Sequence, residues 1–301
     1  MKDIIIVNEE EFERKKQEFI SAGCGNFHVL ADFDKTLTNA FIEGKEAHSS
    51  YAWIRKQKYL SEEYTKKAYE LYHKYNPIEV DPNIDLEEKN VKMLEWWSKH
   101  LDLFVEYGLN KNILKKIIDT NKIKLRDKGE EFIKLLKKKE IPLLILSAGL
   151  GDIIKGFLEM KNMLSKNMHI ISNFLEFDES GKVISYKSKI IHTFNKNEYA
   201  IKDTAYYKEV EDRKNVLLLG DNIGDLGMSE GLEHNSIIKI GFLSHKNPLG
   251  FSGCRKSSIS QHKKKEKILL EKFKENYDVI ILNDGSMDFV NDLIKEIKNE
   301  L

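Results

Sequence analysis

Three short apolar runs lie along this chain, and each of them ends at a cluster of polar residues. The runs are Val29 to Ala31, Pro142 to Leu146 and Val216 to Leu219. They lack the polar alternation of a half-exposed strand, so they are typical of strands buried on both faces of a parallel sheet. Ligands of such sheets bind beyond the carboxyl ends of the strands. We therefore expect the three polar clusters to meet at one edge of an α/β fold.

The segment from Thr38 to Lys124 has a different pattern, with charged residues at helical spacing and no apolar strands. Its clearest part is Leu86 to Tyr107, where apolar side chains fall on or near one side of a helix: Val91, Met93, Leu94, Trp97, Leu101 and Phe104. An insertion here would lie over the sheet edge as a lid, and lids exclude water when they close. The pattern predicts a doubly wound parallel sheet in residues 1–38 and 125–301, with a helical cap in residues 39–124 inserted after the first strand.

The remaining patterns predict elements that complete this core. Residues 8–22 form a charged amphipathic helix that packs on the sheet. Residues 169–190 alternate around a polar turn, which predicts a hairpin that helps line the site opposite the cap. A late strand is expected over 279–282 and a closing helix over 286–301. From 244 to 272 we expect a mobile loop and an exposed helix, the alternative being that its lysine run binds phosphate.

Composition narrows the classes of protein to which the chain can belong. With 301 residues, 41% of them hydrophobic, it can bury a full α/β core and a cap. The 49 basic and 49 acidic residues balance to zero net charge, so nothing indicates nucleic-acid binding. No apolar run approaches the ~20 residues of a membrane span, and the acidic N-terminal stretch does not fit a secretory signal. We expect a cytoplasmic protein that binds no membrane, with Cys24 and Cys254 as reduced thiols.

The first polar cluster, Asp32-Phe-Asp34-Lys-Thr36, suits phosphoryl transfer. Asp32 comes directly after a buried strand, where its carboxylate can attack phosphorus and form a covalent intermediate. Asp34 can protonate the leaving oxygen and then take a proton from water. Thr36 can hold the Asp34 loop or donate to phosphate. The alternative is that these residues merely cap a turn, where Asp and Thr are common.

The other two clusters favour the chemical reading. Ser147-Ala148-Gly149 can grip phosphate oxygens through a hydroxyl and backbone N–H groups, although an ordinary N-cap serine would look the same. Gly220-Asp221 follows the third run, and Asp221 with Asp32 would form the hard-oxygen site that Mg²⁺ prefers. Asp225 lies one helical turn further on, where it can orient a lysine or the waters around the metal.

These three motifs, in this order, resemble the haloacid dehalogenase (HAD) superfamily of phosphatases. A narrower resemblance, to the cytosolic pyrimidine 5′-nucleotidases of the 5′-nucleotidase III group, covers the chain from about residue 28 to its end. It is carried by stretches in the order that is typical of that family: Ile78 to Pro82, Glu95-Trp96-Trp97, Ser147 to Asp152, Ile171 to Asp178, Ile191 to Lys196 and Ile238 to Phe242.

The resemblance implies a role for each matching residue. Asp32 would be the nucleophile and Asp34 the proton donor. Mg²⁺ would be held by Asp32, Asp221 and the backbone carbonyl of Asp34, supported by Asp225. The phosphate would contact Ser147, Ala148 and Lys196. Lys196 is identified only by the resemblance, because the chain holds 49 basic residues and most basic side chains are solvated.

The resemblance also implies residues that read the base, contributed by the cap. Glu79 would accept a hydrogen bond from an exocyclic amine, which suits cytosine or guanine. Without the resemblance, Glu79 would be interpreted as a surface residue. Trp96 and Trp97 are about 100° apart on a helix, so we expect them to face different environments. We expect Trp97 to stack on the base, the alternative being that both only pack cap helices. Where the family commonly has serine or alanine before a histidine in the cap, this chain reads Ser98-Lys99-His100-Leu101, which places His100 near the substrate unless it is a surface histidine.

The sequence therefore predicts a monomeric, Mg²⁺-dependent 5′-nucleotidase. The branch of the family with Glu-Trp-Trp resembles enzymes that also cleave 7-methylguanosine monophosphate, and a tryptophan face and a carboxylate both favour that cationic base. We expect 7-methylguanosine monophosphate and the pyrimidine nucleotides CMP and UMP to be preferred, with transfer to a second nucleoside as a side reaction. The alternatives are a HAD phosphatase for phosphoserine or a sugar phosphate, and a nucleotide-binding protein without turnover.

Overall fold

A seven-stranded, mostly parallel sheet forms the centre of the molecule. The computed structural model describes residues 3–56, 59–81, 83–120, 122–201, 204–244 and 256–297. In spatial order the strands are β1 (Ile4–Ile6), β11 (Val279–Leu282), β10 (Ser236–Leu243), β9 (Asn215–Gly220), β2 (Phe27–Ala31), β5 (Leu143–Leu150) and β6 (Met168–Asn173). Only the pairing of β1 with β11 is antiparallel. The predicted α/β class and parallel sheet are confirmed.

The apolar runs become strands because both faces of the sheet are covered. Alternate side chains of β2 enter two different core clusters, Val29 and Ala31 in one and Leu30 in the other. The first cluster includes side chains from α1 (Glu9–Ala22), α6 (Gly129–Lys138), α7 (Gly151–Met160) and α10 (Asp288–Glu296), and it extends into the helices between β2 and α6. The second includes side chains from α8 (Ala205–Val210), α9 (Lys256–Asn276) and the short helices η3 (Glu198–Ile201) and η4 (Ile223–Ser229). An unbroken apolar run is what a strand between two such layers requires.

The strand order places the site. Chain order runs outward from β2 to β5 and β6 on one side, and returns to β9, β10 and β11 on the other. Ala31, the last residue of β2, pairs with Ile145 of β5 and with Leu219 of β9, so the polar residues that follow these three positions meet at one edge of the sheet. This reversal of direction is a topological switch point, where ligands of open α/β sheets bind.

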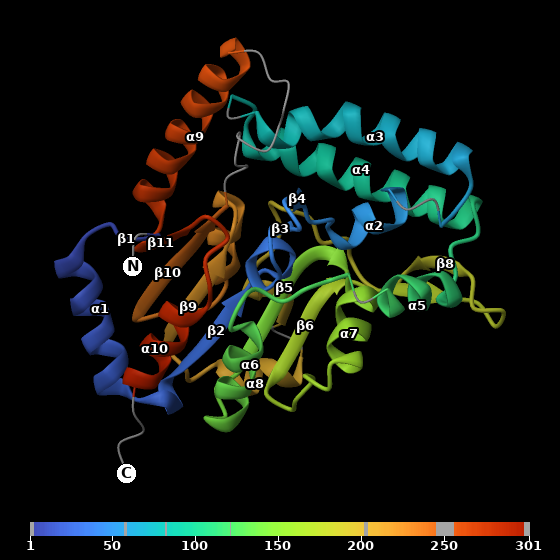
Figure 1. Ribbon diagram of the computed structural model, residues 1–301. Coiled ribbons are helices and arrows are strands. Elements are labelled where there is room, and N and C mark those ends of the chain that lie inside the picture. Colours follow the sequence, from blue (N-terminus) through green and yellow to red (C-terminus); the bar gives the residue numbers. More distant parts are fainter. Residues whose placement is uncertain are drawn as a thin grey trace.

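Helices between β2 and β5 lie over that edge of the sheet. They are α2 (Ser50–Lys56), α3 (Glu62–Val80), α4 (Leu86–Glu106) and α5 (Lys111–Asp119), preceded by a small hairpin of β3 (Phe41–Ile42) and β4 (Lys45–Glu46). Figure 1 shows α3 and α4 side by side across the top of the sheet. The predicted helical insertion is confirmed, and the boundaries at residues 39 and 124 stay a prediction.

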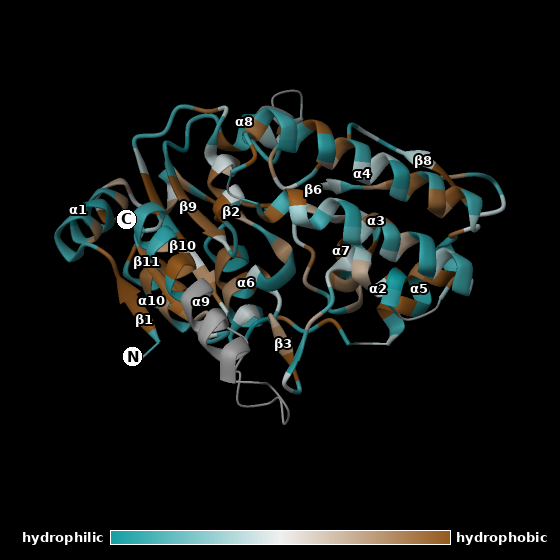
Figure 2. Ribbon diagram, turned by 90° about the horizontal axis from the view of Figure 1, so that it is seen from above, coloured by the Kyte–Doolittle hydropathy of each residue, from teal (hydrophilic) through white to brown (hydrophobic). Residues whose placement is uncertain are grey.

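The predicted cap helix 86–107 is α4, but the side that it buries differs from the expected one. Its buried side chains are Met93, Trp96, His100, Leu103 and Phe104, whereas Val91 and Leu94 are 60% and 48% exposed. Those five fall at the 3–4-residue spacing of one helical face, and α3 is the main neighbour of that face. The predicted stripe was too wide, because Val91 and Leu94 point away from the α3 contact. Figure 2 shows both teal and brown segments along these helices, whereas the strands are mostly brown.

Most of the flanking predictions hold. The amphipathic pattern of 8–22 is α1, capped by Asn8 and packed against β10. The late strand is β11, and the closing helix is α10. Strand β1 was not predicted, because three residues at a sheet edge are too short to show a pattern. Residues 245–255, and with them the expected loop and Cys254, lie outside the described residues, whereas Cys24 is a buried free cysteine.

The predicted hairpin forms from β7 (Leu175–Phe177) and β8 (Val183–Tyr186), but it does not line the pocket. It packs against α4 instead, and the Tyr186 hydroxyl lies 2.6 Å from that of Tyr51 on α2. The hairpin therefore supports the cap helices from the side. None of the described helices combines the length and apolar character that crossing a bilayer requires.

Candidate active site

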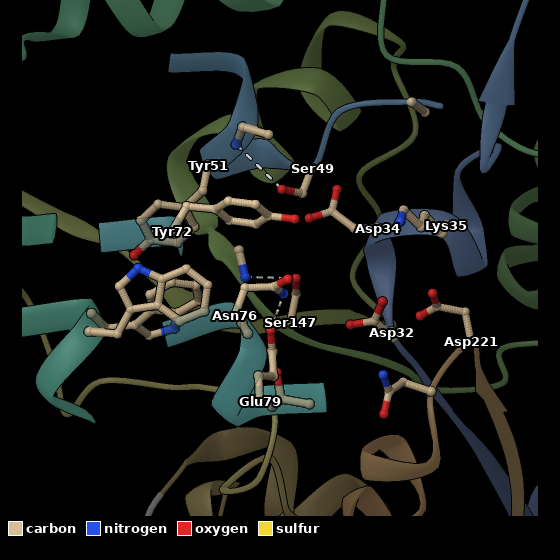
Figure 3. A pocket seen from close by; sticks show the side chains of 18 of the residues that line it. Asp32, Asp34, Lys35, Ser49, Tyr51, Tyr72, Asn76, Glu79, Ser147 and Asp221 are labelled. Atoms are coloured by element: carbon tan, nitrogen blue, oxygen red, sulfur yellow. Dashed lines mark hydrogen bonds between the residues drawn. The ribbon is translucent and has the colours of Figure 1, made fainter. Parts of the chain in front are cut away.

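The ends of β2 and β9 bring three carboxylates into one cluster. Asp32 follows β2, Asp221 follows β9, and Asp225 lies on η4 just beyond. Carboxylate oxygens of all three lie within 4.8 Å of one another. Figure 3 shows Asp32 and Asp221 directed toward the same space, with Asp34 nearby. The structure thus brings Asp32 and Asp221 together, as the sequence predicts.

Lys196 is the buried cation beside this cluster. Its Nζ donates to Asp32 Oδ1 at 2.5 Å and to Asp225 Oδ1 at 2.9 Å. The other oxygen of Asp225 accepts the backbone N–H groups of Asp221 and Asn222, both at 3.0 Å. Asp225 therefore holds both the lysine and the loop that carries Asp221, which is the supporting place that the sequence predicts for it.

The cluster holds more carboxylates than cations, and this changes its protonation. Burial, reinforced by the charge of Asp225, raises the pKa of Asp221 to about 7. Burial also raises the pKa of Asp32 well above its usual value, although Lys196 acts against it. Burial opposes the charge of Lys196, but Asp225 and Asp32 outweigh it and raise the pKa of the amine. Because a divalent cation would relieve this excess of negative charge, and carboxylate oxygens are hard ligands, the donor set fits Mg²⁺.

Asp34 is partly buried close to Asp32 and is oriented by the cap. Its Oδ2 accepts the N–H of Ser50 at 3.2 Å and the Ser50 hydroxyl at 3.3 Å. Burial raises the pKa of the Asp34 carboxyl, and the two hydrogen bonds from Ser50 only partly oppose this shift. A raised pKa favours the protonated form that a general acid needs. No sequence signal pointed to Ser50, which lies at the start of α2.

The loop that carries Asp34 is held by Thr38 and not by Thr36. The Thr38 hydroxyl accepts the N–H of Lys35 at 2.9 Å and donates to the carbonyl of Phe33 at 3.2 Å. Thr36 is fully buried, its hydroxyl has no partner among the described residues, and it does not line the pocket. The expectation that Thr36 holds this loop is wrong, because the left-handed backbone at Lys35 turns the chain so that Thr38 closes it.

The end of β5 supplies a narrow polar loop beside the carboxylates. The Ser147 hydroxyl is buried and accepts the N–H of Gly149 at 3.1 Å, while Asn173 donates to the Ala148 carbonyl at 2.9 Å. Ser147 is not the N-cap of α7, because that position is Leu150. A Cβ on Gly149 would lie 2.2 Å from the Ser50 hydroxyl, so only glycine fits there.

A cavity of about 320 Å³ joins these groups to the cap. At its cap side, Glu79 accepts from the Thr193 hydroxyl at 2.7 Å and from the Asn76 amide at 3.3 Å. Figure 3 shows Glu79 and Asn76 beside the pocket, with Tyr72 farther from Asp221. Glu79 is therefore a pocket residue and not a surface one. The contact with Thr193 ties the cap to the loop that carries Lys196.

The two tryptophans share the pocket, which the sequence analysis did not expect. Trp97 donates from Nε1 to the Ile191 carbonyl at 2.9 Å, and its ring stacks on Tyr51 at 4.7 Å with an angle of 16°. Trp96 is buried against Tyr75, yet it lines the same cavity. The expectation of different environments is wrong, because the cavity reaches between α2, α3 and α4 and meets both rings.

His100 is buried rather than a surface histidine. Only 3% of it is exposed, and it lines the cavity among the rings of Tyr51, Trp96 and Trp97. Burial, together with the charge of Arg55, lowers its pKa to about 3, so the ring is neutral at pH 7. Its Nδ1 has no hydrogen-bond partner among the described residues.

Comparison with known proteins gives findings of three kinds. Residues 35–251 match the family model described as pyrimidine 5′-nucleotidase. The chain is 36% identical over 274 residues to 7-methylguanosine phosphate-specific 5′-nucleotidase A of Xenopus laevis, which covers 91% of this chain and 88% of the relative. The crystal structure of cytosolic 5′-nucleotidase IIIB bound to cytidine is similar at a TM-score of 0.84 and 30% identity, covering 99% and 94% of the two chains. A HAD-family hydrolase of Salmonella enterica shares the fold at a TM-score of 0.56 and 16% identity, covering 97% and 82%.

Proposed function

The chain belongs to the pyrimidine 5′-nucleotidase family, has a HAD-like fold and is a 5′-nucleotidase; from this premise we propose that it hydrolyses nucleoside 5′-monophosphates through an aspartyl phosphate on Asp32. The observation that carries the proposal is the position of Asp32. Its carboxylate lies 2.5 Å from Lys196, in one cluster with Asp221 and beside the partly buried acid Asp34. A nucleophile, a cation and an acid are thus gathered at one end of a cavity.

The first half of the reaction uses Asp32 and Asp34. A carboxylate oxygen of Asp32 attacks phosphorus, and the bond between phosphorus and the 5′ oxygen breaks. Asp34, whose raised pKa favours the protonated form, gives its proton to the departing 5′ oxygen, so that the nucleoside leaves neutral. Ser50 orients Asp34 throughout, through the two hydrogen bonds to its carboxyl.

The second half regenerates the enzyme. Water attacks the phosphorus of the aspartyl phosphate, Asp34 takes a proton from that water, and the bond between phosphorus and Asp32 breaks to release phosphate. A nucleoside hydroxyl that replaces the water would accept the phosphoryl group instead, which accounts for phosphotransfer as a side reaction. Ser147 and the backbone N–H of Ala148 would hold the phosphate oxygens during both halves.

Negative charge must be offset when a carboxylate approaches a phosphate dianion. Lys196 supplies one positive charge, held in place by Asp225. Asp32, Asp221 and the backbone carbonyl of Asp34 would hold Mg²⁺, which when bound supplies the remaining charge and polarises the phosphate. The raised pKa of Asp221 supports this assignment, since it marks a carboxylate without enough positive charge nearby.

The cap side of the cavity suits a nucleobase. Glu79 can accept from the amine of cytosine or guanine, and Trp97 lines the same cavity, where its ring can stack on the base. The Xenopus relative is named for 7-methylguanosine phosphate, and the similar crystal structure of cytosolic 5′-nucleotidase IIIB has cytidine bound. For this chain we propose 7-methylguanosine monophosphate, CMP and UMP as preferred substrates, and a cytoplasmic monomer.

A substrate panel tests the proposal. Purified protein with Mg²⁺ should hydrolyse 7-methylguanosine monophosphate and CMP with higher kcat/KM than AMP or GMP, and nucleotides faster than phosphoserine or sugar phosphates. Activity should vanish with EDTA and return with Mg²⁺. Equal turnover of all four nucleotides would reject the base preference, and faster turnover of phosphoserine would reject the nucleotide assignment.

A further inference from the structure

A buried arginine lines the substrate cavity without an anionic partner. Arg55 lies near the end of α2, and only 9% of its surface is exposed. Its guanidinium lies over two rings of α3, 4.3 Å from the centroid of Tyr72 and 5.1 Å from that of Tyr69. Among the described residues it makes no hydrogen bond or ion pair, and its buried Nε has no acceptor. A buried charge is usually paired, so this one lacks its counterpart.

Arg55 belongs to the end of the cavity that is remote from the carboxylate cluster. It packs on Tyr72, which Figure 3 shows across the pocket from Asp221. Asn76 and Glu79, which line the cavity as well, lie on α3 like Tyr72, and His100 on α4 also lines it. The phosphate chemistry therefore leaves Arg55 unused, and a phosphate held at Asp32 does not neutralise it.

No residue that the structure describes around Arg55 supplies the missing acceptor. His100 is neutral and feels the charge of Arg55, which lowers the histidine pKa further. The tyrosines offer ring faces, which stabilise a cation but accept no hydrogen bond in its plane. Burial lowers the pKa of Arg55, yet a guanidinium keeps its charge in proteins. The N–H groups of Arg55 can thus donate hydrogen bonds to a bound molecule.

We propose that Arg55 is a specificity-determining residue that donates to a carbonyl oxygen of the nucleobase, on the same base edge that presents an N–H to Glu79. The inference rests on the proposed function, because it assumes that the base occupies this end of the cavity. Cytosine, uracil, guanine and 7-methylguanine each carry a ring carbonyl, whereas adenine has none. With Arg55 as the donor and Glu79 as the acceptor, the cavity favours bases that carry a ring carbonyl over adenine.

IMP and AMP provide the probe, because at C6 the first has a carbonyl and the second an amine. Both are measured as inhibitors of CMP hydrolysis, so that each gives a constant even where its own turnover is slow. Wild-type protein should bind IMP more tightly than AMP. Arg55→Met should reduce this ratio by about 10- to 100-fold, which is the usual effect of losing one hydrogen bond to a charged group. Arg55→Lys, which keeps a donor, should restore part of the ratio.

A purely structural role for Arg55 gives a different result. If the side chain only ties α2 to α3, Arg55→Met would weaken IMP and AMP binding equally and leave their ratio unchanged, which would overturn the inference. Lys67→Gln is the matched control, since it removes a cap cation that lies outside the cavity and should leave the ratio unchanged. A wild-type ratio of one would also overturn the inference.

The two proposals fail in distinguishable ways. Wild-type protein that hydrolyses no nucleotide contradicts the proposed function itself. Wild-type protein that hydrolyses CMP, with the same IMP to AMP ratio before and after Arg55→Met, contradicts only the role of Arg55.

Discussion

At the scale of single residues, the chemistry depends on carboxyl groups whose environments differ although they are close neighbours in the chain. Asp32 contacts Lys196 and belongs to the charged cluster, whereas Asp34, two positions later, accepts among the described residues only from the backbone and hydroxyl of Ser50. Burial raises the pKa of both. A cation beside one group and neutral donors around the other suit a nucleophile and an acid respectively.

Asp32→Asn should abolish turnover and the trapping of a phosphoenzyme. Because burial raises the pKa of Asp32, its ionised form destabilises the fold above its usual pKa, so the neutral amide should not lower the melting temperature at pH 7. Phosphate release and thermal unfolding, measured on the same preparation, check both statements. Asp292→Asn, an exposed change on α10, is the control that should keep full activity. A labelled phosphoenzyme in Asp32→Asn would contradict the assignment.

Asp34→Asn should slow both halves of the reaction, and more strongly for poor leaving groups. A nucleotide needs a proton on its 5′ oxygen, whereas an activated aryl phosphate leaves without one. The expected loss in kcat/KM is about 10²- to 10⁴-fold on CMP and smaller on 4-nitrophenyl phosphate. An equal loss on both substrates would show that Asp34 is not the proton donor.

At the scale of elements, the segment that carries Lys196 connects the cap to the core. Thr193 donates to Glu79 on α3, and the Ile191 carbonyl accepts from Trp97 on α4. Asn173 at the end of β6 holds the same segment from the other side, through both its N–H and its carbonyl at Ile191. The cap residues proposed to contact the base and the core lysine proposed to contact the phosphate are therefore connected by one short piece of backbone.

Thr193→Val should impair base recognition. The change removes the donor to Glu79 Oε1 while nearly keeping the side-chain volume, so Glu79 loses its orientation. We expect KM for CMP to rise about tenfold, consistent with the loss of a hydrogen bond to a charged group, with a smaller change in kcat. Thr193→Ser keeps the hydroxyl and should restore most of the affinity. If kcat falls and KM does not change, the contact acts through Lys196 instead.

At the scale of the whole molecule, a buried carboxylate joins three distant parts of the core. Glu198 in η3 accepts from His28 of β2 at 2.9 Å and from His234, just before β10, at 2.7 Å. Burial opposes the charge of Glu198, but the hydrogen bonds from His234 and His28 outweigh it and lower the carboxyl pKa. Since Glu198 is two residues from Lys196, this cluster also anchors the segment that carries Lys196.

Glu198→Gln should lower stability in a pH-dependent way. A depressed carboxyl pKa stabilises the fold above the unfolded value of 4.5, and this contribution is lost as pH falls through the folded pKa. Urea unfolding should therefore show the variant about 1–3 kcal/mol less stable than wild type at pH 7, with the difference shrinking below pH 4. A difference that is constant with pH would contradict the charged role of Glu198. Glu211→Gln is the control, because the side chain of Glu211 makes no buried hydrogen bond among the described residues.

Much of the fold and part of the site could be read from local sequence. The apolar runs ending at Asp32, Ser147 and Asp221 predict the sheet and its reactive edge, because burial on both faces requires uninterrupted apolar strands. Strand β1 and the β3–β4 hairpin were not predicted, because strands of two or three residues are too short to show a periodic pattern of apolar side chains. The predicted buried face of α4 was too wide, because the sequence of a helix does not show which neighbouring element it will pack against.

The sequence by itself determined the order of the strands along the chain, the polar groups at their ends and therefore the class of chemistry. Only the tertiary structure decided which side chains serve that chemistry from afar: Ser50 on Asp34, Thr193 on Glu79, and Arg55 unpaired in the cavity. Lys196 was named by resemblance alone, since it meets Asp32 across 164 positions. The physical reason is that a strand end is a local property of the chain, whereas a contact between cap and core joins residues far apart in the sequence and exists only in the packed tertiary structure.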